Sequence, residues 1–390
     1  MNPNENIPAL SRWTNTVLIG LFMMMLWLPT LDTFFHLDWT PVRSENRALA
    51  SFPKTPSDWH GLQTSVAGLE AYFNDHFGCR KCLVQWYNKV RWSVLKDKNS
   101  NTRDVLVGKD GWLYYTKAEM IDHYTGLRQF TPEQLHDWKV LLEKRRDWLA
   151  RRGIAYLFVV TPDKQTIYPE VLPDWVKKVR PQTKLDQFVA YMRTNSTVPV
   201  LDQRDVLIQA KQVCPTYYKT DVHWNLFGGF VAYQQLMQAL ARQRPGLEPL
   251  PLTAFTLTNV IPTAGDFAKG GDLARMLGLT MVESNYFELI PKPGMPQFTS
   301  KLPPPERVHD PKFTNNPQAK ERMIVFQDSF AMNWIQFLGY HFNEVTYLWQ
   351  YDLNPAYIEQ DKPDIVVNEM NERFFNTVTP AKLTASEALH

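Results

Sequence analysis

The fold prediction starts from one stretch: Met323-Ile324-Val325-Phe326-Gln327-Asp328-Ser329-Phe330. Its first four residues form a strand-like apolar run, and the residues after Phe330 follow a helical pattern. Ser329 would then lie on a strand-to-helix turn, where its hydroxyl projects beyond the strand end and a backbone N–H at the helix start can face an oxyanion. Most Asp-Ser-Phe strings are ordinary helix caps, so Ser329 is a candidate nucleophile that needs a partner base.

A second string, Asp221-Val222-His223-Trp224, offers that base. It precedes a predicted helix from Leu226 to about Gln243. His223 can take the proton of a serine hydroxyl, and Asp221 can orient the imidazole. If the fold brings the two strings together, Ser329, His223 and Asp221 form a Ser-His-Asp triad.

The order of the surrounding elements favours such a fold. Apolar runs predict further strands, and the pattern between them predicts helices, one of which begins at Thr131-Pro132. Alternating strands and helices indicate an α/β protein with a parallel sheet and helices on both faces. Reactive groups in such sheets gather beyond the carboxyl ends of the strands, where Ser329 and the turn at 368–373 fall. The predicted strands, apart from 323–326, are 154–160, 198–201, 344–348 and 364–367, and a helix is expected over 183–194.

Several strings together resemble a known family, the SGNH-hydrolase-like domain of alginate O-acetyltransferases of the AlgX/AlgJ type. In this type the order is permuted, so that Asp-x-His precedes the serine, as it does here. SGNH proteins usually have Gly before the Asp-Ser pair, where this chain has Gln327. The strings are Arg43-Ser44-Glu45-Asn46-Arg47, Asp75-His76-Phe77-Gly78-Cys79-Arg80, Val107-Gly108-Lys109-Asp110-Gly111-Trp112-Leu113-Tyr114, Pro162-Asp163-Lys164, Tyr168-Pro169-Glu170, Thr220-Asp221-Val222-His223-Trp224-Asn225, Gly271-Asp272-Leu273, Asp328-Ser329-Phe330, Lys362-Pro363-Asp364-Ile365-Val366-Val367 and Glu372-Arg373.

The N-terminus predicts the compartment. The run Val17–Leu28 carries no charge, and about 20 apolar residues span a bilayer. No small-residue cleavage site follows it, which favours an uncleaved signal anchor over a cleaved signal peptide or a buried core helix. We therefore expect a cytoplasmic tail over 1–15, a transmembrane anchor over 16–35 in the inner membrane, and the rest of the chain in the periplasm.

The remaining chain is expected to contain a connecting region over 36–100, with two helices within 67–96, and the SGNH-hydrolase-like domain over 101–390, with a proline-rich insertion at about 244–320. A length of 390 residues and 44% hydrophobic content allow a sizeable core. The net charge of +2 argues against nucleic-acid binding. The three cysteines do not have the pattern of a zinc site, and we interpret them as free or singly bridged; one disulfide would be Cys79–Cys214 or Cys82–Cys214. No metal or cofactor is predicted.

Three further residues are candidates for the substrate site. Trp224 is adjacent to the predicted base and would either contact a sugar or pack under the triad. Asn371 and Arg373 lie on the turn after the last strand and would bind the acyl oxygen or steer an anionic sugar. The alternative for Arg373 is a structural salt bridge with Glu372 or another carboxylate. The other histidines singled out, which we interpret as structural, are His76, His123, His136 and His341.

The resemblance implies a function for these residues. Ser329 would accept an acetyl group and pass it to a hydroxyl of an exported polysaccharide, such as alginate, cellulose or another exopolysaccharide. A membrane-bound O-acyltransferase would supply the acetyl groups, and other polysaccharide secretion proteins would be partners. The alternatives are a polysaccharide acetylesterase with the same triad and a non-catalytic adaptor of an acetylation complex. The anchor makes the chain more similar to the AlgJ type than to the AlgX type.

Overall fold

The computed structural model describes residues 9–35, 50–53, 59–79 and 104–386, and the single positions Leu83, Trp86, Tyr87 and Val90. The chain divides into two compact units. The first comprises residues 1–97 and 275–279, and the second comprises 98–274 and 280–390.

The first unit contains two long helices, α1 (Ala9–Phe35) and α2 (Trp59–His76). Helix α1 carries the apolar run Val17–Leu28, whose large side chains are exposed. Within the described ranges, no helix has the length and mean hydropathy that a membrane span requires. The N-terminal anchor therefore stays a prediction. Helix α2 begins earlier than expected and ends at His76; the second helix expected within 67–96 lies mostly outside the described residues, as does the connecting segment 36–49.

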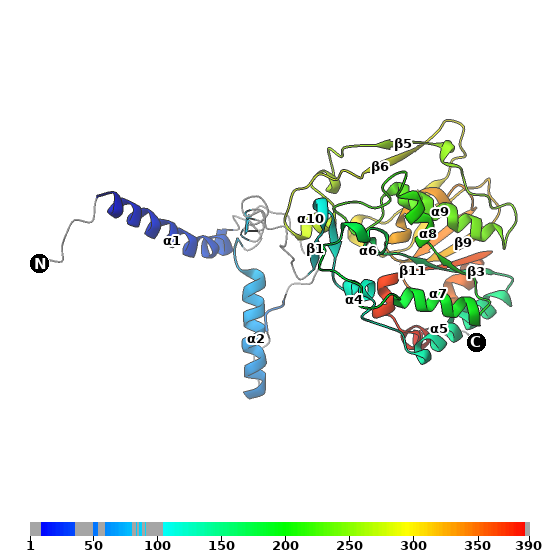
Figure 1. Cartoon of the computed structure of the whole chain (residues 1–390), viewed down its shortest axis with the longest axis horizontal. Helices are drawn as coiled ribbons and strands as arrows, with labels where there is room; N and C mark the ends of the chain where they lie inside the picture. Colours follow the sequence, from blue (N-terminus) through cyan, green and yellow to red (C-terminus); the bar gives the residue numbers. More distant parts are fainter. Residues whose placement is uncertain are drawn as a thin grey trace, which may run out of the picture. The chain divides into compact units, whose positions relative to one another are not determined.

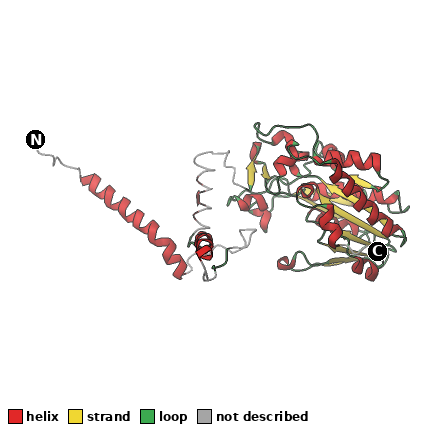
Figure 2. Cartoon of the chain, turned by 90° about the horizontal axis from the view of Figure 1, so that it is seen from below, coloured by secondary structure: helices red, strands yellow, loops and turns green. Residues whose placement is uncertain are grey.

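The second unit is organised around a seven-stranded sheet in the order β4-β3-β11-β9-β10-β8-β7. Figure 1 labels β3, β9 and β11 of this sheet, and Figure 2 draws strands in yellow. The first five strands in this order pair in parallel. Strand β8 is antiparallel to both of its neighbours, β10 and β7. The strands are β3 (Ala155–Thr161), β4 (Val200–Asp202), β7 (Thr299–Lys301), β8 (Lys312–Asn315), β9 (Arg322–Phe326), β10 (Glu344–Leu348) and β11 (Ile365–Asn371).

The parallel part of the sheet confirms the predicted strands. The sheet as a whole is mixed, so the prediction of a purely parallel sheet is wrong. Strands β7 and β8 both lie within the 244–320 insertion. They are three and four residues long and follow a proline-rich segment, so their apolar pattern was too short to reveal them. The insertion also folds into a separate antiparallel pair, β5 (Phe255–Asn259) and β6 (Phe287–Pro291).

Two helices of this unit begin at a capping box. Helix α5 (Pro132–Ala150) starts with a complete capping box, in which the Thr131 hydroxyl accepts from Gln134 N and the Gln134 side chain accepts from Thr131 N. Helix α7 (Lys184–Asn195) starts in the same way at Thr183. The other helices of this unit are α4 (Met120–Thr125), α6 (Lys164–Ile167), α8 (Arg204–Ala210), α9 (Leu226–Ala241), α10 (Asp272–Met276), α11 (Ile335–Leu338), α12 (Pro355–Asp361) and α13 (Pro380–Ser386); short 3-10 turns include η7 (Phe330–Trp334) and η8 (Glu372–Asn376).

Two apolar cores sandwich the sheet because side chains alternate across each strand. In β9, Met323 and Val325 face the core beneath α9, whereas Ile324 and Phe326 face the core beneath α5 and α7. Figure 1 shows α8 and α9 on one side of the sheet and α5 and α7 on the other. A strand buried on both faces reads as an unbroken apolar run, which is why the sequence identified these strands.

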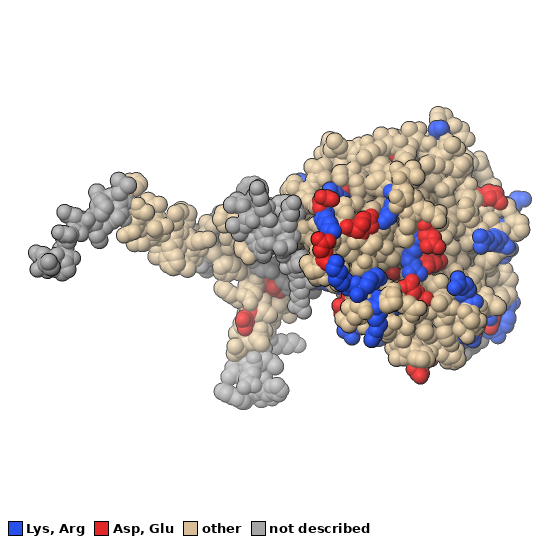
Figure 3. Space-filling view, in the orientation of Figure 1, with Lys and Arg blue, Asp and Glu red and all other residues tan. Residues whose placement is uncertain are grey.

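Charges on the second unit are mixed. Lysine, arginine and acidic side chains lie interspersed on the face drawn in Figure 3. Several of them pair, as Lys109 does with Asp174 at 2.6 Å and Arg128 does with Glu119 at 2.9 Å. Exposed pairs of this kind contribute only about 0–1 kcal/mol each. The two apolar cores are therefore what stabilises the fold.

Two of the three cysteines, Cys79 and Cys214, lie among the described residues. Cys79 and Cys214 do not form a disulfide, so of the alternatives that the sequence leaves open, the Cys79–Cys214 pairing is not found. Cys82 lies outside the described residues, and the Cys82–Cys214 pairing stays a prediction.

Candidate active site

The predicted serine turn forms at the carboxyl end of β9. After Phe326 the chain passes through Gln327 and Asp328 into η7, with Ser329 at its N-terminal cap. Gln327 is buried and has no positive φ, so the turn does not need the glycine that SGNH proteins usually have here. The first turn is a 3-10 helix rather than the expected α-helix.

Asp328 holds this turn in place. One carboxylate oxygen accepts from Phe330 N at 2.9 Å, and the other accepts from Asn371 N and the Tyr351 hydroxyl, both at 2.9 Å. Asp328 N donates in turn to the buried Glu369 carboxyl at 2.9 Å. Burial and the neighbouring Asp328 raise the pKa of Glu369 well above its ordinary value. The serine turn is thus tied to strand β11.

The structure brings the serine to the Asp-x-His string. The distance from His223 Nε2 to Ser329 Oγ is 2.7 Å, and the distance from His223 Nδ1 to Asp221 Oδ1 is also 2.7 Å. Asp221 Oδ1 accepts from His223 N as well, at 3.0 Å. With a proton on Nδ1, the imidazole can accept the serine proton at Nε2. The geometry is that of a Ser-His-Asp triad.

A buried lysine supports the loop that carries Asp221 and His223. The ammonium group of Lys164, at the start of α6, donates to the carbonyl oxygens of Tyr218 (3.0 Å), Lys219 (3.3 Å) and Asp221. Burial lowers the pKa of Lys164 to about 8. At neutral pH the group is still mainly an ammonium ion, whose three N–H donors match the three carbonyls.

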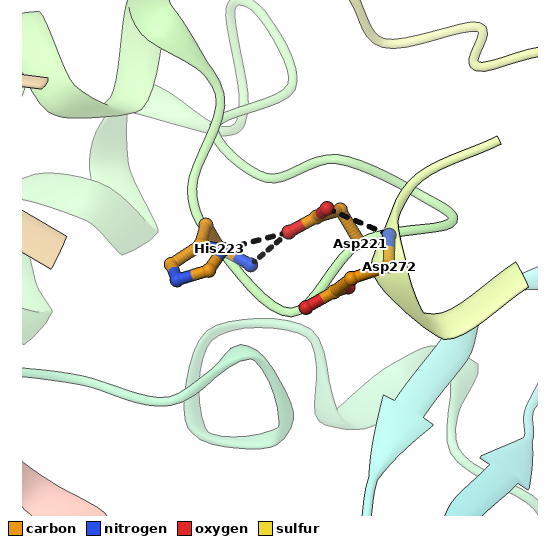
Figure 4. Close-up of side chains that lie close together, drawn as sticks. All are labelled: Asp221, His223 and Asp272. Carbon is orange, nitrogen blue, oxygen red and sulfur yellow. Dashed lines mark hydrogen bonds and ion pairs between the residues drawn. The ribbon is translucent and has the colours of Figure 1, made fainter. Parts of the chain in front are cut away.

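The other side of this loop contacts the segment around Gly271. Asp272 N donates to Asp221 Oδ2 at 2.9 Å, and Val222 N donates to Asp272 Oδ1 at 3.0 Å. Figure 4 shows Asp221, His223 and Asp272 side by side. A Cβ on Gly271 would lie 2.4 Å from Asp221 Cβ and 2.8 Å from Asp221 N, so only glycine fits.

The electrostatics of the pair suit a general base. Burial would raise the pKa of Asp221, but the hydrogen bond and charge of His223 outweigh it and hold this pKa well below the ordinary value. Burial would lower the pKa of His223, but Asp221 outweighs it and raises this pKa above 6.5. Asp221 is therefore ionised at neutral pH and stabilises the imidazolium that forms when His223 takes a proton.

Asp221, His223 and Asp272 each have one donor atom within 4.8 Å of the others. Such residue types can bind metals, but here the atoms already have protein partners. Both oxygens of Asp221 and Asp272 Oδ1 accept hydrogen bonds, and His223 is bonded at both ring nitrogens. We therefore interpret the cluster as the Asp221–His223 pair of the triad with one neighbouring carboxyl group, that of Asp272.

The three candidate substrate residues have different surroundings. Trp224 is fully buried, donates from Nε1 to Phe330 O at 3.0 Å and packs against the Phe330 and Trp334 rings. Its predicted sugar contact is therefore wrong, and the alternative, packing under the triad, is what its contacts support. Asn371 is buried, accepts from Arg373 Nε at 2.7 Å and donates to Pro162 O at 3.4 Å. An oxyanion role for Asn371 stays a prediction.

Arg373 forms a buried ion pair. Its guanidinium approaches Asp163 Oδ1 to 2.6 Å without the alignment of a hydrogen bond, and lies 5.2 Å from the Phe330 ring. The partner is thus Asp163 and not Glu372, whose carboxylate faces His123 at 3.3 Å. Burial, opposed by Arg373, raises the pKa of Asp163 to about 7.

No local sequence pattern connected several of these residues with the site. His123 was interpreted as structural because no carboxylate lies at a telling spacing from it in the sequence; its partner Glu372 is 249 residues away. Lys164 and Asp272 occur in the strings that carry the family resemblance, but nothing in their local pattern indicated contact with Asp221. His341 is structural, as expected, with Nε2 bonded to the Tyr233 hydroxyl at 2.5 Å.

A mainly parallel sheet covered on both faces, with a serine turn and an Asp-x-His loop meeting at its carboxyl edge, defines an SGNH-hydrolase-like α/β protein. Residues 105–310 match the family model described as an SGNH hydrolase-like domain, acetyltransferase AlgX. The chain belongs to this family.

Comparison with individual known proteins agrees with this family membership. The chain is 30% identical over 246 residues to a probable alginate O-acetylase AlgJ of Pseudomonas syringae, covering 63% of this chain and 57% of the relative. It is 31% identical over 209 residues to the Pseudomonas putida protein of the same name, covering 52% and 49%. The chain thus spans about half the length of the curated relatives it matches. The fold is similar to that of Bacillus cereus PatB1, with a TM-score of 0.53, 17% identity and coverage of 73% and 98%.

We predict that Gly271→Ala displaces the Asp221 loop. The added methyl group must push Asp221 away, which should lower the free energy of unfolding by about 1–3 kcal/mol. Amide exchange at Val222 and His223 should accelerate, because both amides donate to the displaced carboxylates. Urea denaturation and hydrogen-exchange mass spectrometry measure the two effects. Gly20→Ala is the matched control, since nothing lies within 4 Å of its added Cβ; unchanged stability and exchange in Gly271→Ala would contradict the argument.

Proposed function

We propose that the chain is an O-acetyltransferase that modifies an exported polysaccharide through an acetyl-Ser329 intermediate. One observation carries the proposal: an unbroken hydrogen-bond chain from Ser329 through His223 to Asp221, across segments 106 residues apart. Family membership and relatives named as probable alginate O-acetylases support it. A non-catalytic adaptor would have no need of this alignment.

In the first half-reaction, Ser329 Oγ attacks the acetyl carbonyl of the donor. His223 Nε2 takes the hydroxyl proton, and the ionised Asp221 stabilises the imidazolium. Collapse of the tetrahedral intermediate breaks the bond to the leaving group, which receives the proton from His223. The product is an ester of acetate with Ser329.

In the second half-reaction, a sugar hydroxyl gives its proton to His223 Nε2 and attacks the acetyl carbon. Ser329 leaves and recovers the proton, so the enzyme returns to its starting state. Water in place of the sugar would make the same site an acetylesterase. The residues of the triad serve both reactions, and only the acceptor differs.

The oxyanion of each tetrahedral intermediate needs a hydrogen-bond donor. We propose the backbone N–H of Ser329, at the start of η7, because no hydrogen bond to another described residue occupies it. Arg373 adds a positive charge beside Phe330. Its ion pair with Asp163 fixes the guanidinium, so this charge is preorganised rather than mobile.

The relatives' names favour alginate or a related exopolysaccharide as the acceptor. We further propose that a membrane-bound O-acyltransferase supplies the acetyl group and that other polysaccharide secretion proteins are partners. A polymer that has left the cytoplasm can be acetylated only by an enzyme on the same side of the membrane.

Our first functional prediction concerns the nucleophile. Para-nitrophenyl acetate should acetylate Ser329, and Ser329→Ala should lower turnover by about 10³-fold or more. His223→Ala should lower turnover equally, and Asp221→Asn should lower it somewhat less. The Ser329→Ala/His223→Ala double variant should be no slower than either single variant, because the residues act as a unit. Absorbance kinetics and peptide mass mapping measure turnover and the acetylated position. Ser300→Ala, an exposed serine on β7, is the matched control; acetylation of another residue would refute the assignment.

A second prediction separates transfer from hydrolysis. Cells that carry Ser329→Ala at normal expression should secrete the polymer in normal amounts but without its acetyl groups. Acetyl content is measured by NMR of the purified polymer. A polymer that became more heavily acetylated would identify an acetylesterase instead.

We also propose that α1 anchors the chain in the inner membrane and that the SGNH-hydrolase-like domain lies in the periplasm. The exposed apolar side chains between Val17 and Leu28 are unfavourable in water and would be stabilised by lipid. A C-terminal reporter active only in the periplasm should then be active, and the protein should sediment with inner membranes and retain residue 1. A mature N-terminus between about 30 and 45 would instead indicate a cleaved signal peptide.

A further inference from the structure

A second carboxyl group lies against the triad and has no part in the mechanism above. Asp272, the first residue of α10, comes from a segment about 50 residues beyond Asp221. Figure 4 shows its side chain beside those of Asp221 and His223. Oxygen or nitrogen atoms of all three side chains lie within 4.8 Å of one another.

Asp272 and the Asp221 loop exchange hydrogen bonds in both directions. The backbone of Asp272 donates to Asp221 Oδ2 at 2.9 Å, and its carboxylate accepts from Val222 N at 3.0 Å. Asp221 Oδ2 is thereby occupied, and Oδ1 is left for His223, which donates to it from both N and Nδ1. The two segments also pack closely at Gly271, where an added Cβ would lie 2.4 Å from Asp221 Cβ.

We propose that Asp272 is a positioning residue of this active site, and that the charge of its carboxyl group adjusts the basicity of His223. This inference rests on the proposed triad function. Asp272 touches neither nucleophile nor acceptor, so it acts through Asp221 and His223.

The groups around Asp272 allow its charge to change near neutral pH. Asp221 and His223 face it from the Asp-x-His loop, Lys164 from α6 and Tyr115 from β2 (Leu113–Tyr115). Glu283, which accepts from Thr220 N, is a further carboxylate near Lys164. Burial and the negative charge of Asp221, only partly offset by His223, raise the pKa of Asp272 to about 7.

The two charge states of Asp272 affect His223 differently. An ionised Asp272 adds a second negative charge near the imidazole and raises the pKa of His223. When Asp272 is neutral, only Asp221 raises the pKa of His223. A rise in pH through neutrality would therefore make His223 a stronger base while the hydrogen bonds of the loop persist.

Asp272→Asn tests the charge separately from the hydrogen bonds. The amide keeps an oxygen for Val222 N and reproduces the neutral form at all values of pH. The titration midpoint of His223, followed by NMR of the ¹³C-labelled imidazole, should move to lower pH than in the wild type. The acidic limb of kcat/KM for para-nitrophenyl acetate should move in the same direction, because turnover needs neutral His223.

Asp272→Ala tests the positioning. Loss of the acceptor for Val222 N should let Asp221 shift and lower kcat by about 10²-fold, with a smaller loss in Asp272→Asn. Glu359→Gln is the control for an equal change of charge, since Glu359 is exposed on α12, away from the site. Its His223 midpoint and pH profile should match the wild type.

The outcomes are distinct. A His223 midpoint that is the same in Asp272→Asn and wild type, or higher in the variant, would overturn the proposal. Equal kcat in Asp272→Ala and wild type would overturn the positioning role. If wild-type protein shows no turnover at all, the proposed function fails, but the NMR titration still decides whether Asp272 acts on His223.

Discussion

The hydrogen bond between His223 Nε2 and Ser329 Oγ is the interaction on which the site depends. It joins two strings 106 residues apart at 2.7 Å, and neither string can form it alone. Asp328 holds the serine turn against β11, and Lys164 holds the histidine loop against α6. Small displacements of either support would break the alignment, because a misplacement of about 1 Å can cost about 10²-fold in rate.

The site is built on buried ionisable groups. Lys164, Asp163 and Glu369 are almost fully buried, and burying an unpaired charge is costly. Each has a specific compensation: carbonyl oxygens around Lys164, the Arg373 guanidinium beside Asp163, and the Thr161 hydroxyl and Asp328 N–H on Glu369. Polar networks of this kind leave few alternative arrangements, so they favour one loop geometry. The same burial moves the pKa values of Asp163 and Asp272 towards neutrality.

How far the sequence predicts this structure depends on the range of the interactions. The five parallel strands, the cap at Thr131, a helix over 183–194 and the serine turn were predicted, because each depends on neighbouring residues. Strands β7 and β8 were missed, since short segments with little apolar alternation become strands only by pairing, β8 with β10 and β7 with β8. For Trp224, a ring beside the base could equally face solvent or the core, and only packing against Phe330 and Trp334 decided between them.

The sequence by itself determined the α/β architecture, the serine turn, the pairing of Asp221 with His223 and the family. These follow from periodicity, capping and short motifs, all of which act within a few residues along the chain. The tertiary structure alone decided which distant groups complete the site: Asp272 against Asp221, Asp163 against Arg373, and His123 against Glu372. The two residues of each pair lie about 50 to 250 positions apart along the chain. Such pairs meet only when the sheet forms and its strand order brings the distant segments together.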